Sequence, residues 1–538
     1  MFDELRTFTR YAGGLRAYLQ QTLSPEECRR RIENQLRARQ ETFLQILERG
    51  IFTNPRSPYR NLLTRAGVEF SDIAQMVRAT GIETTLEKLY DRGVYVTLDE
   101  FKGRKPIERA GLHLPVGAND FDNPLLARHY EAATGGSSGV RRRILIDFDL
   151  LTHEAAYYHF FLQAFNLEGR PLAEWREILP GAAGMKLVLR YARLGRPVEK
   201  WFTPRRLAER PENWKSDVFT VYSLCGSRLW GRTPLPVPEH VPPAEAWRIA
   251  RWLAEKKKGG TPAVMDTPAS SGVLICRAAK ELGLDISGTF FRFGGEPYTP
   301  AKARIIAEMG CRAAGHYSMT EIGVIGLACG DPGSLDDVHL MTDKVAAIQR
   351  QKQVGSSGIC VGALIYSTLL PSCPKIMLNI ESDDYGVLED RQCGCVLGGL
   401  GFSRHIHDIR SYEKLTSAGM SFLGTELISL VEEILPGRFG GHPTDYQFVE
   451  EEQDGLTKVR LVVSPRVGAV NEKEVLAEVL RVLRSYPGGR MMADVWRDGR
   501  VLEIARREPY ATGAFKILPL HILKKAGPRQ AAGKAADS

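Results

Sequence analysis

Between about residues 90 and 300, short apolar runs alternate with stretches whose apolar residues recur at helical spacing. The run RILIDF at 143–148 predicts a strand, and residues 152–165 predict an aromatic-rich helix. Residues 243–258 predict a further helix with proline in its first turn. Strands that alternate with helices are typical of α/β folds. We therefore expect a large α/β unit in the N-terminal part of the chain.

The last quarter of the chain has a different pattern. Residues 446–452 and 458–463 are strand-like and flank the turn residues 453–455, which predicts a hairpin. Residues 471–486 predict a helix, and residues 495–504 predict a second hairpin. Hairpin, helix and hairpin together indicate a smaller α+β domain.

These changes of pattern divide the 538 residues into three parts. We expect an N-terminal domain over 1–409 and a C-terminal α+β lid domain over 410–523. Residues 524–538 are rich in Ala, Gly, Lys and Pro, and we expect this tail to be disordered.

Charge and cysteine content constrain the class of protein only broadly. Lys and Arg number 72 against 64 Asp and Glu, a weak basic excess that suits nucleotides as well as nucleic acid. Nine scattered cysteines favour a reducing compartment, and no apolar stretch approaches 18 residues. We expect a cytoplasmic protein without a membrane span.

A glycine- and serine-rich loop precedes the predicted strand at 143–148. It reads TGGSSG and is followed by three arginines. Its residues are Thr134, Gly135, Gly136, Ser137, Ser138 and Gly139. Glycines free backbone N–H groups to turn toward an anion, and hydroxyls add donors. The loop therefore predicts a phosphate site, although alone it also fits a plain surface turn.

The same loop matches the G-x-S-x-G pattern of a hydrolase nucleophile elbow. That elbow needs a buried strand before the serine and a helix after it. Here the preceding residues 128–131 are polar, and a basic run and a strand follow. The context does not favour a hydrolase.

Two further segments follow in order. The first is Gly294, Gly295, Glu296 and Pro297, with a helix predicted over 300–309. The second is YSMTE, which contains Tyr317, Ser318, Thr320 and Glu321. Each motif is weak alone, but their order and spacing behind the Gly/Ser loop are specific.

Together the three motifs resemble those of the adenylate-forming superfamily, which includes the acyl-CoA synthetases. The resemblance implies that residues 134–139 grip phosphate and that residues 294–297 form the adenine-binding turn. It also implies that Thr320 contacts phosphate and that Glu321 helps to hold Mg²⁺.

Later segments add to the resemblance. Asp384 lies in a motif similar to the family's ribose-binding aspartate motif, and Arg410 lies where the family has its hinge arginine. Near the C-terminus, Lys516 lies in a loop similar to the one that carries the adenylation lysine. The closest branch is the phenylacetate–CoA ligase-like group, which residues 54–68 and the Cys-x-Cys before the hinge resemble.

The chain also departs from the family pattern. Val140-Arg141 replaces Lys-Pro, Gly315 replaces Asp or Asn, and the hinge reads Arg410-Ser411-Tyr412-Glu413. Ala514 and Phe515 separate the last glycine from Lys516, so Lys524 and Lys525 remain alternatives for the lysine.

The resemblance implies ATP-dependent activation of a carboxylic acid to acyl-AMP, followed by transfer to a thiol. The acceptor is CoA, or alternatively the phosphopantetheine of an acyl carrier protein. We expect no nucleic-acid or membrane partner, and a monomer or homodimer. A different class of function is a catalytically degenerate nucleotide-binding scaffold.

The aromatic residues of the helix predicted at 152–165 are candidates for an acyl pocket, and core packing is the alternative. They are Tyr157, Tyr158, Phe160 and Phe161.

Four residues have the chemistry of a structural zinc site. Cys393 and Cys395 are close enough in sequence to bind one ion, and Cys329 and His339 would complete a Cys₃His set. The alternative is that the cysteines are small buried hydrophobes. For His405 and His407, which alternate onto one strand face, we expect a structural role.

Overall fold

The computed structural model describes most of the chain. It covers residues 2–126, 130–133, 143–209, 213–354, 359–411, 416–417, 420–421, 424–453, 456–485, 502–512 and 515–523. The predicted phosphate loop at 134–139, Lys524, Lys525 and the tail lie outside the described residues.

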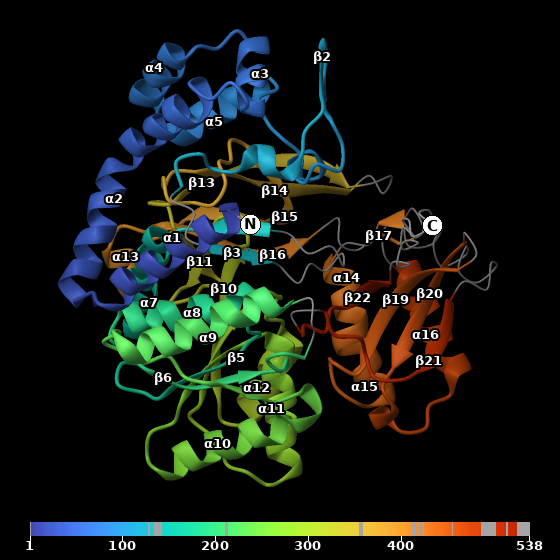
Figure 1. Cartoon of the computed structure of the whole chain (residues 1–538). Helices are drawn as coiled ribbons and strands as arrows, with labels where there is room; N and C mark the ends of the chain where they lie inside the picture. Colours follow the sequence, from blue (N-terminus) through green and yellow to red (C-terminus); the bar gives the residue numbers. More distant parts are fainter. Residues whose placement is uncertain are drawn as a thin grey trace, which may run out of the picture.

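A twelve-stranded sheet runs through the large unit in the order β13-β14-β15-β16-β12-β11-β10-β9-β8-β5-β6-β7 (Figure 1). One half of this sheet is parallel. Its strands are β5 (Leu172–Trp175), β6 (Val198–Thr203), β7 (Pro238–His240), β8 (Val264–Thr267), β9 (Phe290–Gly294) and β10 (Arg312–Met319). The predicted α/β class is confirmed.

Helices precede and connect the parallel strands. They are α7 (Phe148–Ala164), α8 (Ala182–Arg193), α9 (Trp214–Leu229), α10 (Ala246–Lys258), α11 (Ala269–Glu281) and α12 (Pro300–Glu308). A 3₁₀ turn over Pro243–Glu245 leads into α10. Local interactions determine where helix α12 begins. The Thr299 hydroxyl accepts from the backbone of Lys302, and Pro300 occupies the first turn.

Helix α7 is buried over most of its surface, so its aromatic residues belong to the core. Tyr157, Tyr158, Phe160 and Phe161 are each at most 2% exposed. The core-packing alternative is therefore confirmed for these four side chains.

The other half of the sheet is antiparallel. Its strands are β11 (Gly323–Ala328), β12 (Val338–Leu340), β13 (Val345–Val354), β14 (Ile359–Thr368), β15 (Ile380–Asp390) and β16 (Arg404–Ser411), with the short helix α13 (Val396–Gly399) before β16. Short two-stranded pairs are β1 (Ile107–Arg109) with β2 (Leu112–Leu114), β3 (Tyr130–Ala133) with β4 (Arg143–Ile146), and β17 (Thr416–Ser417) with β18 (Met420–Ser421).

N-terminal helices cover the large unit (Figure 1). The first of them packs beside α7 and α8, and the later ones pack beside the antiparallel half of the sheet. They are α1 (Phe2–Leu19), α2 (Pro25–Ile46), α3 (Pro58–Arg65), α4 (Phe70–Thr80), α5 (Ile82–Asp91) and α6 (Leu98–Phe101), with a π-helical turn over Leu47–Phe52 and a 3₁₀ turn over Ala118–Phe121. A capping box between Ser24 and Glu27 fixes the start of α2.

The C-terminal residues form a separate four-stranded sheet in the order β21-β20-β19-β22. Its elements are α14 (Gly424–Ser429), a π-helical turn over Leu430–Ile434, α15 (Leu435–Phe439), β19 (Tyr446–Gln453), β20 (Leu456–Val463), a 3₁₀ turn over Pro465–Val467, α16 (Glu472–Ser485), β21 (Leu502–Arg506) and β22 (Leu520–Leu523). These elements enclose their own apolar core. The predicted smaller α+β unit and the pairing of β19 with β20 are confirmed.

The second predicted hairpin, at 495–504, falls largely outside the described residues. Its described end belongs to β21, which runs parallel to β20.

Two buried ion pairs join the C-terminal unit to the large unit at α11 and α12. Arg277 on α11 donates to Asp445 at 2.8 Å, and Lys302 on α12 contacts Glu432 at 2.8 Å. These contacts hold α11 and α12 against the start of β19 and the π-helical turn before α15.

No helix among the described residues combines the length and the apolar character needed to cross a membrane.

Candidate functional site

The Gly-Gly-Glu-Pro turn lies at the carboxyl end of β9. A side chain at Gly294 would overlap the ring of His316, because its Cβ would lie 1.9 Å from the ring Cε1. Gly295 has φ +90°, which favours glycine. Glu296 fixes the turn, since its Oε1 accepts from the backbone and hydroxyl of Ser270 at 2.6 and 2.8 Å.

Lys516 lies against this turn from the C-terminal unit. Its Nζ donates to the carbonyl of Gly295 at 2.7 Å, across 221 residues of sequence. Its loop is held by Thr512, whose hydroxyl accepts from the backbone of Lys516 at 3.1 Å. The backbone of Ile517 also donates to the Ser270 hydroxyl at 3.3 Å. The predicted lysine and the predicted adenine turn are therefore neighbours.

Tyr317 and Asp384 form a second contact between predicted site residues. The Tyr317 hydroxyl donates to Asp384 Oδ2 at 2.6 Å. Burial, together with the Asp384 charge, raises the pKa of Tyr317 well above its ordinary value. The tyrosine therefore stays a neutral donor and fixes one carboxylate oxygen of Asp384.

Ser318 lies near the end of β10, and Thr320 and Glu321 lie in the turn that leads from β10 to β11. None of the three is buried. The predicted phosphate and metal groups are thus at one end of the strand that carries Tyr317.

Arg410 lies on β16, directly beside the strand of Asp384. Its backbone is in register with Tyr385, and its guanidinium donates to Asp336 at 2.8 Å. The structure therefore places Arg410 in an ion pair with the turn that precedes β12, and one strand from Asp384.

Strands β3 and β4 flank the predicted phosphate loop. Ala133 and Arg143 are paired, so the loop connects two antiparallel strands. A strand rather than a helix therefore follows the serines, which confirms that the context is not that of a hydrolase elbow.

A buried charge network that no sequence motif indicates lies behind the turn at 320–322. Glu154 on α7 accepts from Lys344 Nζ at 2.6 Å, from the backbone of Val324 at 2.8 Å and from Arg190. The side chains of Glu154 and Lys344 are fully buried. The network ties α7 and α8 to the first residues of β11.

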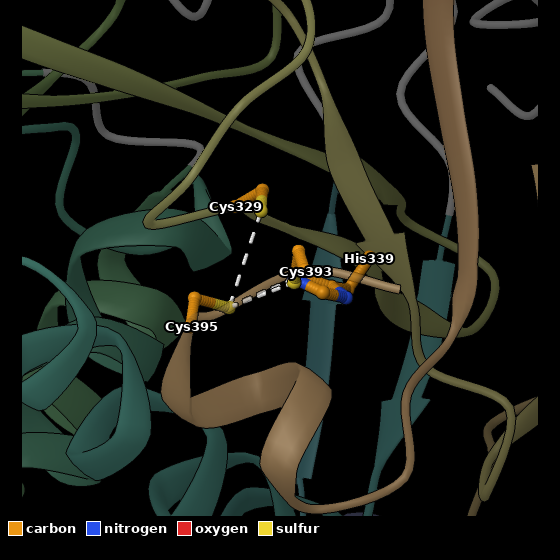
Figure 2. Close-up of side chains that lie close together, drawn as sticks. All are labelled: Cys329, His339, Cys393 and Cys395. Atoms are coloured by element: carbon orange, nitrogen blue, oxygen red, sulfur yellow. Dashed lines mark hydrogen bonds between the residues drawn. The ribbon is translucent and has the colours of Figure 1, made fainter. Parts of the chain in front are cut away.

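The four predicted zinc ligands lie together between β11, β12 and the segment before α13 (Figure 2). Their ligand atoms all lie within 4.8 Å of one another. The Cys395 sulfur is 4.0 Å from Cys329, 3.5 Å from Cys393 and 3.0 Å from His339 Nε2.

These spacings fit a tetrahedral Cys₃His site, in which bonds of about 2.0–2.3 Å place the ligand atoms somewhat under 4 Å apart. The second ring nitrogen of His339 donates to the carbonyl of Phe402 at 2.7 Å, which leaves Nε2 as the ligand atom. The donor set therefore fits Zn²⁺.

The two other histidines have carboxylate partners. His405 is paired with Asp337 at 2.7 Å, and His407 with Asp408 at 2.8 Å. Arg391 also contacts Asp337. Both histidines thus contact carboxylates, and their structural role stays a prediction; His405 also lies with Asp337 and Cys329 in a second group whose ligand atoms are within 4.8 Å of one another.

No family model and no curated protein matches the chain. Among solved structures, 2-hydroxyisobutyryl-CoA ligase in complex with 2-HIB-AMP and CoA is 15% identical, covers 91% of each chain and has a TM-score of 0.46. MatB from Rhodopseudomonas palustris with ATP bound is 13% identical, covers 76% of this chain and 68% of its own, and has a TM-score of 0.42. McyG A-PCP complexed with phenylalanyl-adenylate is 14% identical, covers 81% and 73%, and has a TM-score of 0.40.

Proposed function

We propose that this protein is an adenylate-forming acid–thiol ligase. It converts a carboxylic acid and ATP into acyl-AMP and pyrophosphate, and then transfers the acyl group to a thiol. The observation that carries the proposal is the contact of Lys516 Nζ with the carbonyl of Gly295. This contact joins two distant segments that the family resemblance assigns to one site.

In the first step, a carboxylate oxygen bonds to the α-phosphorus of ATP and the bond to pyrophosphate breaks. Lys516 stabilises the negative charge shared by carboxylate and phosphate, because a compact ammonium can contact both. Thr320 binds the α-phosphate, and the loop at 134–139 binds the departing phosphates. Glu321 is the residue that would hold Mg²⁺, which neutralises phosphate charge.

Tyr317 and Asp384, which contact each other, hold the two parts of the nucleoside. Tyr317 and residues 294–297 enclose the adenine, and the other carboxylate oxygen of Asp384 accepts from a ribose hydroxyl. Arg410 lies at the proposed hinge between the large unit and the C-terminal unit. Because Tyr317 already fixes Asp384, nucleotide binding costs little reorientation.

In the second step, a thiol attacks the acyl carbonyl carbon and AMP leaves. We favour CoA as the acceptor and a phenylacetate–CoA ligase-like enzyme of the cytoplasm. A carrier-protein phosphopantetheine is the alternative acceptor. The unusual hinge, Arg410-Ser411-Tyr412-Glu413, is what favours a second candidate function, that of a catalytically degenerate scaffold.

Pyrophosphate exchange tests the proposal. With a panel of aryl, fatty and biosynthetic acids, the wild-type protein is expected to exchange labelled pyrophosphate into ATP. Asp384→Ala should raise the KM for ATP about 10- to 100-fold, since it removes a charged acceptor. Asp390→Ala, at the exposed end of the same strand, is the control and should have no effect. ATP binding without exchange for every acid would establish the scaffold instead.

We further propose that Cys329, His339, Cys393 and Cys395 hold a structural Zn²⁺. Purified protein is expected to contain about one Zn²⁺ per chain by elemental analysis. Cys393→Ser should release the metal and lower the melting temperature, because metal binding contributes to folding. Cys225→Ser, at an exposed cysteine on α9, should retain both metal and stability. Folded, active protein without metal would refute the zinc assignment.

A further inference from the structure

Three charged residues form a row across the buried parallel strands. Glu174 on β5 is in register with Asp266 on β8, and Asp266 is in register with Arg292 on β9. All three are at most 2% exposed. Charged side chains are rarely buried in this way unless they serve a structural or functional purpose.

Arg176, Gly294 and His316 lie two residues further along their chains, toward the carboxyl ends. Gly294 is in register with His316 on β10, and Arg176 follows the last residue of β5. Ligands of open α/β sheets bind at this end of the strands. Gly294 is also the residue before Gly295, which Lys516 contacts. The charged row therefore lies next to the proposed adenylation site.

Asp266 holds both arginines in place. Its Oδ1 accepts from Arg176 Nε at 2.6 Å, and its Oδ2 accepts from Arg292. Burial, together with the charge of Asp266, raises the pKa of Glu174 well above its ordinary value, which favours its neutral form. Two guanidinium groups and one carboxylate leave a net positive charge in the interior.

Several polar atoms of this cluster have no hydrogen-bond partner among the described residues. They are both carboxyl oxygens of Glu174, Nη2 of Arg176, Nε and Nη2 of Arg292, and Nδ1 of His316. Buried polar groups are normally paired, and each unpaired group costs free energy. A concentration of them beside a proposed site indicates that a polar ligand completes the pairing.

We infer that this cluster selects the acid, and that Arg176 and His316 contact a second anionic group of the substrate, such as a distal carboxylate. The inference rests on the proposed function, because it concerns the acid that is adenylated. Arg176 is the direct contact of the anion, and Asp266 is a positioning residue. Fatty acids and plain aryl acids would leave the same polar atoms unpaired, so the site disfavours them.

Matched pairs of acids test this inference by pyrophosphate exchange. Adipic acid against hexanoic acid, and terephthalic acid against p-toluic acid, differ only in the distal carboxylate. For at least one pair, the wild-type protein should show a kcat/KM for the diacid at least about 100-fold above that for the monoacid. Arg176→Met should abolish this preference, with the loss confined to the diacid. Arg176→Lys should retain part of it, because the charge remains.

Arg312→Met, at the exposed start of β10, is the matched control and should keep the wild-type preference. Melting temperatures show whether Arg176→Met remains folded, and the wild-type comparison is decisive without any variant. If the wild-type protein activates the monoacids as well as the diacids, the inference is wrong and the proposed function stands. If no acid supports exchange, the proposed function fails and the inference fails with it.

Discussion

Lys516→Ala is expected to reduce acid-dependent pyrophosphate exchange about 10²- to 10³-fold, equivalent to roughly 3–4 kcal/mol of transition-state stabilisation. Lys516 Nζ is the cationic group that the C-terminal unit brings to Gly295, and its loop is fixed by Thr512. Removing it deletes a preorganised charge where negative charge develops. Lys473→Ala, on the first turn of α16, is the control and should be neutral.

The loss at Lys516 should be confined to adenylation. If the C-terminal unit rotates between steps, Lys516 has left the site when the thiol attacks. The Lys516→Ala protein should therefore still convert supplied acyl-AMP to thioester. If Lys516→Ala adenylates normally and Lys524→Ala does not, the adenylation lysine is Lys524, eight residues further along the chain. Normal adenylation by both variants would mean that the C-terminal unit supplies no such lysine.

Glu154→Gln is expected to lower the free energy of unfolding by about 3–5 kcal/mol, as measured by denaturant titration. The carboxylate compensates the charges of Lys344 and Arg190, which are buried with it. The amide leaves both cations without a counter-charge. Glu33→Gln removes an exposed carboxylate that pairs with Arg37 on α2, and should change stability by less than about 1 kcal/mol. Equal losses in the two variants would show that the Glu154 network is well solvated.

Glu154 also implies a pH dependence of stability. Burial alone would raise its pKa, but the charges of Arg190 and Lys344 outweigh burial and hold the pKa below its ordinary value of 4.5. A carboxyl with a lower pKa in the folded state stabilises the protein above the unfolded pKa, and this contribution is lost as the pH falls. Acid unfolding of the wild type should therefore be steeper below about pH 4.5 than that of Glu154→Gln.

The parts of the candidate site that the sequence could predict are those whose chemistry lies in short local runs. Gly294–Pro297, Tyr317 and Asp384 could each be found in a motif, and the structure shows that Tyr317 contacts Asp384. Lys516 could be predicted as the adenylation lysine although two residues separate it from the last glycine, and its contact with Gly295 agrees with that prediction. The role of the loop at 134–139 stays a prediction.

The polar cluster could not be predicted because it is made by strand register. Glu174, Asp266 and Arg292 are 92 and 26 residues apart in the chain, and nothing local relates them. Only the pairing of β5, β8 and β9 places them in one row. Arg176 and His316 are likewise brought together only by the fold, because Arg176 follows the last residue of β5 and His316 is in register with the last residue of β9. The domain limits at 409 and 523 also remain predictions.

The Cys/His cluster has a consequence for the unfolded chain. Cys329 and Cys395 are 66 residues apart, and strands β12 to β15 lie between them. An ion that binds both cysteines closes this segment into a loop and removes most of the extended conformations available to it when unfolded. For a loop of this length the chain-entropy estimate is about 4 kcal/mol. With a bound metal, strands β12 to β15 would therefore remain within a closed loop when the chain unfolds, whereas the parallel strands would unfold as an open chain.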